Sequence, residues 1–142
     1  MNYLHDRYRK AGKISNDDML YTLGLFALEP VRWTDLYDWR QLTQVERCAL
    51  GVLWKDMGES MEISFDQLNL QDSVNSSLAW LNALQNWCSN YEAEKMVPAN
   101  TNEELARATL DIAMFNVPKL LRRVTLKLIS ALLEPRLRRA MM

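Results

Sequence analysis

Histidine, cysteine and glycine are scarce in this chain of 142 residues, which contains one, two and four of them respectively. The single histidine, His5, excludes the two-histidine motif of zinc proteases and the paired Glu-x-x-His motifs of di-iron sites within this chain. Cys48 and Cys88 lie forty residues apart and form neither a metal-binding spacing nor a disulfide framework, so we expect a reducing compartment. The few glycines form none of the known phosphate-binding loops.

Long hydrophobic runs are absent as well. The longest uncharged apolar segment, 19–28, is about half as long as a membrane span, and the first residues lack the layout of a signal peptide. With 49% hydrophobic and 25% charged residues, the composition is typical of a soluble globular protein with one core. We therefore expect a single domain that is cytoplasmic or peripheral when the chain is expressed alone.

Helix signals recur along the chain and strand signals do not, which predicts an all-α fold, a single helical domain of about six or seven helices. Capping side chains and first-turn acids place the helix starts. The expected starts are Asn2, Asp17, Thr43–Glu46, Ser64–Gln67, Asp72–Ser73, Thr101–Glu104 and Pro118. Proline and glycine place the ends or kinks, because proline lacks a backbone donor and glycine suits a helix terminus. These are expected at Gly12, Pro30, Gly58, Pro98 and Pro135, so the last long helix spans about 118–133.

Charge is unevenly distributed, although the net charge is only −1. Residues 1–118 carry ten basic against seventeen acidic side chains, whereas residues 119–142 carry seven against one. The segment 118–142 is therefore basic and amphipathic, which favours either docking on anionic lipid headgroups or a solvated helix packed by its leucines. No nucleic acid is expected as a partner, because no aromatic residues interleave with the basic ones. The cations of the expected membrane surface are Lys119, Arg122, Arg123, Lys127, Arg136, Arg138 and Arg139.

Three kinds of side chain are candidates for a functional site. Asp56, Glu59 and Glu62 are spaced three residues apart, as acid–base pairs or metal ligands can be, but a solvated acidic face is the favoured interpretation. The five tryptophans suit an apolar ligand pocket, yet core packing is favoured for them. His5 is the one imidazole able to act as an axial haem ligand. The tryptophans are Trp33, Trp39, Trp54, Trp80 and Trp87.

Several extended segments carry a further signal. They are Met1–His5, Arg7–Arg9, Ile14–Leu23, Leu28–Trp33, Glu46–Ala49, Trp54–Ile63 and Arg136–Met142. Together they resemble the fungal ER-bound oxygenases of the MpaB type, which are grouped with the catalytic domain of the rubber oxygenase (latex clearing protein). The resemblance runs over nearly the whole chain and consists of long segments rather than one short catalytic signature.

The resemblance implies an all-helical fold that binds haem b and uses O₂ to cleave carbon–carbon double bonds of prenyl or polyprenyl chains in fungal secondary metabolism. His5 falls where the family has its proximal ligand of the haem iron, so it is the candidate cofactor-binding and metal-binding residue, and no catalytic residue is assigned. The family has a further N-terminal part with a membrane anchor. We therefore expect this chain to match the C-terminal portion of a larger fold associated with the endoplasmic reticulum membrane.

Other residues are assigned to this pocket by their hydrophobicity or charge. The apolar segment 19–28 and the region of Trp33 and Trp54 are expected to wall the pocket. Arg32 and Lys55 are expected to meet a substrate carboxylate or a haem propionate, or to pair with nearby acids. The alternative function, from a different class, is a noncatalytic helical module that binds a partner or a membrane surface through its basic C-terminal helix.

Overall fold

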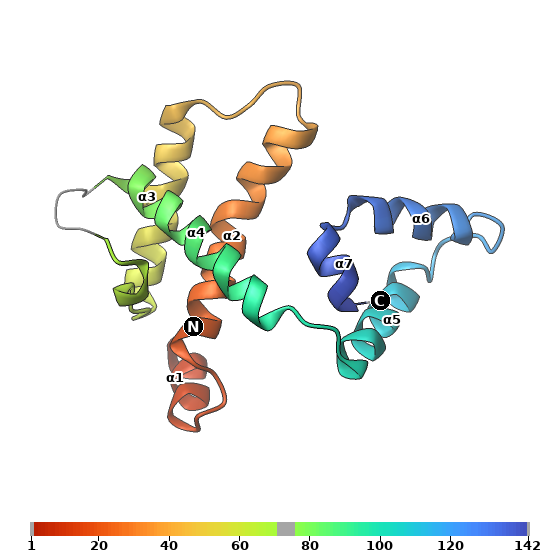
Figure 1. Cartoon of the computed structure of the whole chain (residues 1–142), viewed down its shortest axis with the longest axis horizontal. Helices are drawn as coiled ribbons and strands as arrows, with labels where there is room; N and C mark the ends of the chain where they lie inside the picture. The colour runs from red at the N-terminus through yellow and green to blue at the C-terminus, as the bar shows by residue number, and fades with distance from the viewer. Residues whose placement is uncertain (1, 71–75, 142) are drawn as a thin grey trace. The chain divides into compact units, whose positions relative to one another are not determined.

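The structure is a computed structural model that describes residues 2–70 and 76–141, and in these residues it is all helical (Figure 1). This confirms the predicted fold class and number of helices. The helices form two compact units, residues 1–91 and 92–142, and each is described by itself below. The elements are α1 (Asn2–Lys10), α2 (Asn16–Tyr37), α3 (Gln44–Ser60), the short 3₁₀ helix η1 (Asp66–Leu68), α4 (Ser77–Lys95), α5 (Asn100–Ala113), α6 (Arg122–Leu132) and α7 (Pro135–Met141).

Helix α2 begins where the sequence predicted and ends later. The side chain of Ser15 accepts a hydrogen bond from the backbone N–H of Asp18, and the Asp18 carboxylate accepts one from the Ser15 N–H, which forms a capping box. The expected end or kink at Pro30 does not end the helix, which continues to Tyr37. Proline removes a single backbone donor. The intact hydrogen bonds on both sides, such as that from the Asp38 N–H to the Thr34 carbonyl, hold the remaining turns.

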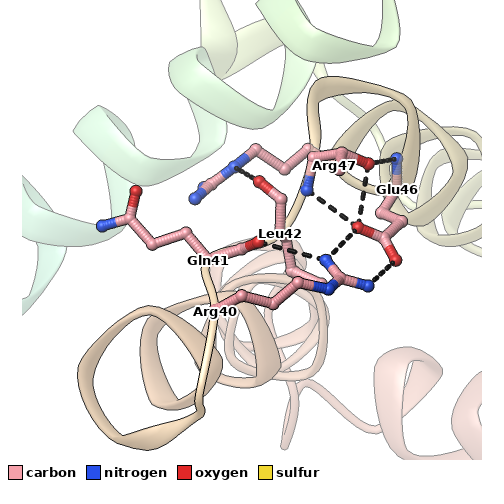
Figure 2. Close-up of polar contacts among 6 residues, drawn as sticks. Arg40, Gln41, Leu42, Glu46 and Arg47 are labelled. Carbon is pink, nitrogen blue, oxygen red and sulfur yellow. Dashed lines mark hydrogen bonds and ion pairs between the residues drawn. The ribbon is translucent and has the colours of Figure 1, made fainter.

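The loop between α2 and α3 is fixed by charged side chains (Figure 2). Thr43 and Glu46 form the predicted capping box, and the Arg40 guanidinium binds both carboxylate oxygens of Glu46 at 2.8 Å. The guanidinium and the Thr43 donors hold the pKa of the Glu46 carboxyl well below its usual range. Arg47 of α3 contacts the Asp35 carboxylate of α2 at 2.6 Å, so this ion pair joins the two helices, while Arg40 holds the loop to the start of α3.

Of the two predicted effects of Gly58, the end of α3 does not occur at this residue, because the helix runs on to Ser60. Gly58 is buried, and a Cβ atom at this position would lie 2.6 Å from Leu23 Cδ2 and 2.7 Å from Phe65 Cζ. Glycine is therefore needed here for the close approach of α2 and of the segment after α3. The helix is closed instead by the N–H groups of Met61 and Ile63, which both bond to the Gly58 carbonyl.

The core of the first unit lies between α2 and α4. Leu20, Trp80 and Leu84 are its largest fully buried side chains. The two helices approach closely at Gly24, where an added Cβ would collide with the Cys88 sulfur. Helix α4 spans 19 residues, and its predicted start at Asp72–Ser73 lies outside the described residues.

The second unit has fewer buried side chains than the first. Among its described residues only Met114 and Ala140 are buried hydrophobics, and α5 packs against α7. Within this unit, Arg136 of α7 contacts the Glu92 carboxylate near the end of α4 at 3.4 Å. Most of the large hydrophobic residues of α5 and α6 are exposed to solvent.

Two helix boundaries in this unit differ from the prediction. Helix α5 begins at Asn100 with Ala99 at its N-cap and no capping side chain, so Thr101–Glu104 forms no capping box. Helix α6 begins at Arg122 rather than Pro118, since residues 118–121 form a turn closed by the Leu121 N–H on the Pro118 carbonyl. Pro135 opens α7 after the last long helix has already ended at Leu132. Proline is tolerated in a first helical turn, where its missing N–H would have no partner.

Candidate functional site

The first unit contains a cavity of about 520 Å³ whose walls are mainly apolar. Helix α2 contributes residues that recur on one face at steps of three and four, and α3 contributes a second apolar face. Helix α1 contributes one residue, His5. The lining residues are His5, Ile14, Asp18, Met19, Thr22, Leu23, Phe26, Trp54, Met57, Met61 and Ile63.

His5 differs from the other polar residues of the wall in having no partner for a buried nitrogen. Its Nδ1 atom is buried and has no hydrogen-bond partner among the described residues. In contrast, the Thr22 hydroxyl donates to the Asp18 carbonyl at 2.8 Å, and the Asp18 carboxylate accepts from Tyr91 at 3.0 Å. Buried polar atoms are usually paired, so this nitrogen on the cavity wall is open to a hydrogen-bond donor, a water or a ligand.

Helix α1 is held in place by side chains at its two ends. The Asn2 side-chain amide donates to the Ser60 carbonyl at 2.8 Å, and the Arg9 guanidinium donates to the Glu62 carbonyl at 3.3 Å. Both acceptors lie at the end of α3 or just beyond it. No described residue of α1 is buried, so these two bonds position His5 against the cavity more than apolar packing does.

The aromatic wall was predicted in part. Phe26 of α2 stacks on Trp54 of α3 with ring centroids 5.5 Å apart, and both line the cavity. The assignment of Trp33 to the wall is wrong, because its indole packs on Tyr37 and donates to the Glu29 carboxylate at 2.9 Å. Trp80 lies in the core, as the packing interpretation predicted.

The charged candidates have ordinary structural roles. Arg32 pairs with Glu29 at 2.6 Å and Lys55 with Glu59 at 3.9 Å, so pairing with nearby acids is the confirmed alternative for both. Asp56, Glu59 and Glu62 are exposed, which agrees with a solvated acidic face.

The described residues form neither a metal-ligand cluster nor a membrane-spanning helix. In residues 2–70 and 76–141, no three His, Cys, Asp or Glu side chains are placed to hold a metal ion. None of the helices in that part of the chain is long and apolar enough to cross a membrane.

Several lining residues were not predicted, among them Ile14, Met57, Met61 and Ile63. The spacing of Trp54, Met57 and Met61 at steps of three and four residues is a signal for one helical face. That signal does not separate a face packed in a core from a face on a cavity. Whether this face meets His5 depends on how α1 packs against the end of α3. A local sequence pattern does not predict that packing.

Comparison with curated proteins shows extended similarity. The chain is 38% identical over 141 residues to the "ER-bound oxygenase mpaB'" of Penicillium brevicompactum and 38% identical over 141 residues to the "ER-bound oxygenase mpaB" of Penicillium roqueforti. Each match covers 99% of this chain. This chain is a homologue of the MpaB-type oxygenases. A third match, at 40% identity over 105 residues, is to the ER-bound oxygenase mpaB of P. brevicompactum.

The chain spans less than half the length of these MpaB relatives. It covers 33% of the first, 47% of the second and 27% of the third. No protein-family model and no solved structure matches the chain. The similarity to MpaB therefore rests on sequence, and the first two alignments span the segments that line the cavity.

Proposed function

We propose that this chain forms part of a haem-dependent oxygenase that cleaves a carbon–carbon double bond of a prenyl-type chain with O₂, and that His5 holds the haem iron. The observation that carries the proposal is the position of His5, the one histidine of the chain, on the wall of an apolar cavity with its Nδ1 atom unpaired among the described residues. The name of the relatives, ER-bound oxygenase, supports the reaction class.

The residues present fit such a group in two respects. An imidazole nitrogen is the commonest proximal donor to a haem iron, and His5 supplies one at the cavity wall. The surrounding methionine, leucine and aromatic side chains suit the apolar faces of a macrocycle or an isoprenoid chain, and pockets for small ligands span about 300–1,000 Å³. No Arg or Lys occurs among the described lining residues, so no partner is assigned to the propionates.

The side chains of this chain would perform three tasks. His5 would hold the iron, and the stacked rings of Phe26 and Trp54 would form the aromatic part of the cavity wall. Met19, Leu23 and Ile63 contact the apolar chain of the substrate. When bound, haem supplies a metal that binds and activates O₂. The overall reaction is balanced without a reductant, because one O₂ and one C=C bond give two carbonyl groups.

Titration of the purified chain with haemin tests the role of His5. We expect a saturable Soret shift at one haem per chain, which is lost in His5→Ala and restored when free imidazole is added to that variant. Tyr3→Ala is the matched control, because Tyr3 lies on the same helix, is 80% exposed and does not line the cavity. It should bind haemin like the parent chain.

Two outcomes contradict the proposal. One is the absence of a Soret shift in the parent chain while far-ultraviolet circular dichroism shows it to be helical. The other is an equal shift in the parent chain and in His5→Ala. If His5-dependent binding is found, the loaded chain is incubated with a prenylated substrate under O₂ and under argon, and O₂-dependent carbonyl products are measured by mass spectrometry.

A further inference from the structure

Helix α6 carries an apolar line that the other described residues of the second unit leave exposed. Val124, Leu128 and Leu132 follow one another at steps of four residues, which places them on one face of the helix. They are 56%, 60% and 44% exposed. These three residues are called the α6 stripe. Exposed apolar side chains occur singly on any protein, but an aligned set marks an interaction surface.

Positive charge lies directly beside the α6 stripe. Arg123 and Lys127 each precede a stripe residue by one position, so they form the neighbouring line of the helix. The side chains of Lys119, Arg123 and Lys127 form no hydrogen bond or ion pair with any residue that the structure describes. Their charges are therefore not compensated within residues 2–70 and 76–141.

The other expected membrane-facing cations are mostly engaged. The guanidinium of Arg122 donates to the Val117 carbonyl at 3.1 Å, and that of Arg139 donates to the Pro135 carbonyl at 3.3 Å. Arg136 pairs with Glu92 at 3.4 Å. Arg122 and Arg139 bond to neutral carbonyls and keep their positive charge, whereas Arg136 faces a carboxylate. The cations of α6 lie next to exposed apolar side chains.

Helix α5 has an exposed apolar line of similar size but opposite charge. Leu105 and Ile112 are largely exposed, and acidic residues adjoin them at Glu104 and Asp111. An anionic surface would be repelled by these acids and attracted to Arg123 and Lys127. The charges therefore select α6, and not α5, as the face for an anionic partner.

We propose that α6 docks on an anionic lipid surface, lying parallel to it with the α6 stripe inserted at the boundary of headgroups and acyl chains. Lys119, Arg123 and Lys127 then contact the lipid phosphates. A short amphipathic helix with leucines on one face and Lys or Arg beside them is suited to this position. The proposal is independent of haem, because it uses no residue of the cavity in the first unit.

Sedimentation of the full chain with phosphatidylcholine vesicles, with and without phosphatidylserine, tests this docking. We expect binding only to the vesicles that contain phosphatidylserine, and weaker binding as salt screens the charges. Replacing Arg123 and Lys127 together by glutamine should weaken binding about 30-fold, since each cation near such a surface contributes about a factor of five. Leu128→Ser should weaken it about tenfold or more, because a buried leucine is lost from the bilayer.

Matched variants distinguish binding through α6 from nonspecific adsorption of the protein to vesicles. Ile112→Ser removes an apolar side chain that is 78% exposed on α5, and Lys13→Glu reverses an exposed charge in the first unit, so both should bind like the parent chain. Because Leu128 and Ile112 are exposed, neither serine variant should lose helical content by circular dichroism.

Three results overturn the proposal. They are equal binding to both kinds of vesicle, equal weakening by Ile112→Ser and Leu128→Ser, and absence of binding to either kind of vesicle. Sedimentation velocity without lipid identifies one alternative occupant, a second copy of the chain. In that case the parent chain self-associates, Leu128→Ser is monomeric, and vesicles containing phosphatidylserine do not sediment the protein.

Discussion

Helices α2 and α4 approach closely at Gly24. We therefore predict that alanine is tolerated at this position only when a second substitution removes the Cys88 sulfur. An alanine Cβ at position 24 would collide with the Cys88 sulfur, whereas the next nearest atoms, on Leu84, lie at 3.6 and 3.7 Å. Those two distances are ordinary van der Waals contacts. Cys88→Ala therefore removes the single obstacle, and the two substitutions form a double-mutant cycle.

The expected free energies have opposite signs in the two backgrounds. Alanine is favoured over glycine inside a helix by about 1 kcal/mol. Forcing an extra methyl group into a packed core costs about 1–3 kcal/mol. In the parent chain, Gly24→Ala should therefore lower the free energy of unfolding by about 1 kcal/mol, from the difference of these two effects. In the Cys88→Ala background it should raise that free energy by up to about 1 kcal/mol, so the coupling energy is about 2 kcal/mol.

Urea unfolding followed by tryptophan fluorescence measures this cycle in the correct part of the chain. All five tryptophans lie within residues 1–91, so the signal reports on the first unit. The coupling energy removes the separate cost of Cys88→Ala, because that cost is common to both variants that carry it. Equal destabilisation by Gly24→Ala in both backgrounds would refute the reasoning, and so would stabilisation in the parent chain.

Two further predictions concern the core and the loop of Figure 2. Leu84 is fully buried, so Leu84→Ala should lower the free energy of unfolding by about 2–5 kcal/mol. The control Leu105→Ala, at an exposed position, should change that free energy by less than about 0.5 kcal/mol. Urea unfolding followed by circular dichroism measures both values. Because the pKa of Glu46 is lowered in the folded state, its contribution to stability is present above the ordinary value of 4.5 and is lost as the pH falls toward the lower folded value. The Glu46→Gln variant should therefore lose less stability than the parent chain when the pH is lowered. Urea unfolding at several pH values measures this difference, and an unchanged pH profile would contradict the assigned role of Arg40 and Thr43.

The helix starts could be predicted where a local side chain decides them. Ser15 and Thr43 cap the helices that follow because a hydroxyl and an acid three residues later satisfy each other's backbone donors. This pattern lies within four residues and requires no knowledge of the fold. The pattern at Thr101–Glu104 failed because α5 begins one residue earlier, at Asn100, which places Thr101 inside the first turn.

The local sequence could not decide whether Pro30 and Gly58 end a helix or lie inside one. Both residues are helix breakers by intrinsic preference, but each lies inside a helix here. Gly58 occurs where Leu23 and Phe65 leave no room for a side chain, and that contact joins residues far apart in the sequence. Tertiary packing therefore determines the glycine at position 58.

One residue of the candidate site, His5, and part of the cavity wall were predicted from the sequence. His5 and the apolar segment 19–28 were identified from the sequence, and Trp54 was placed on the wall with them. The exclusion of Trp33 follows from its hydrogen bond to Glu29, which depends on the continuation of α2 past Pro30. Because the prediction left open whether α2 ends or kinks at Pro30, it did not place that indole.

The attachment of α1 by two side-chain hydrogen bonds has a consequence for the affinity of any ligand of His5. A helix without buried residues opens at a low free-energy cost, so the histidine is presented to the cavity only in the docked fraction of molecules. The apparent dissociation constant equals the intrinsic one divided by that fraction. A ligand on His5 must in turn shift the population toward the docked helix, so the exchange of the α1 amide hydrogens with solvent should slow when the cavity is filled.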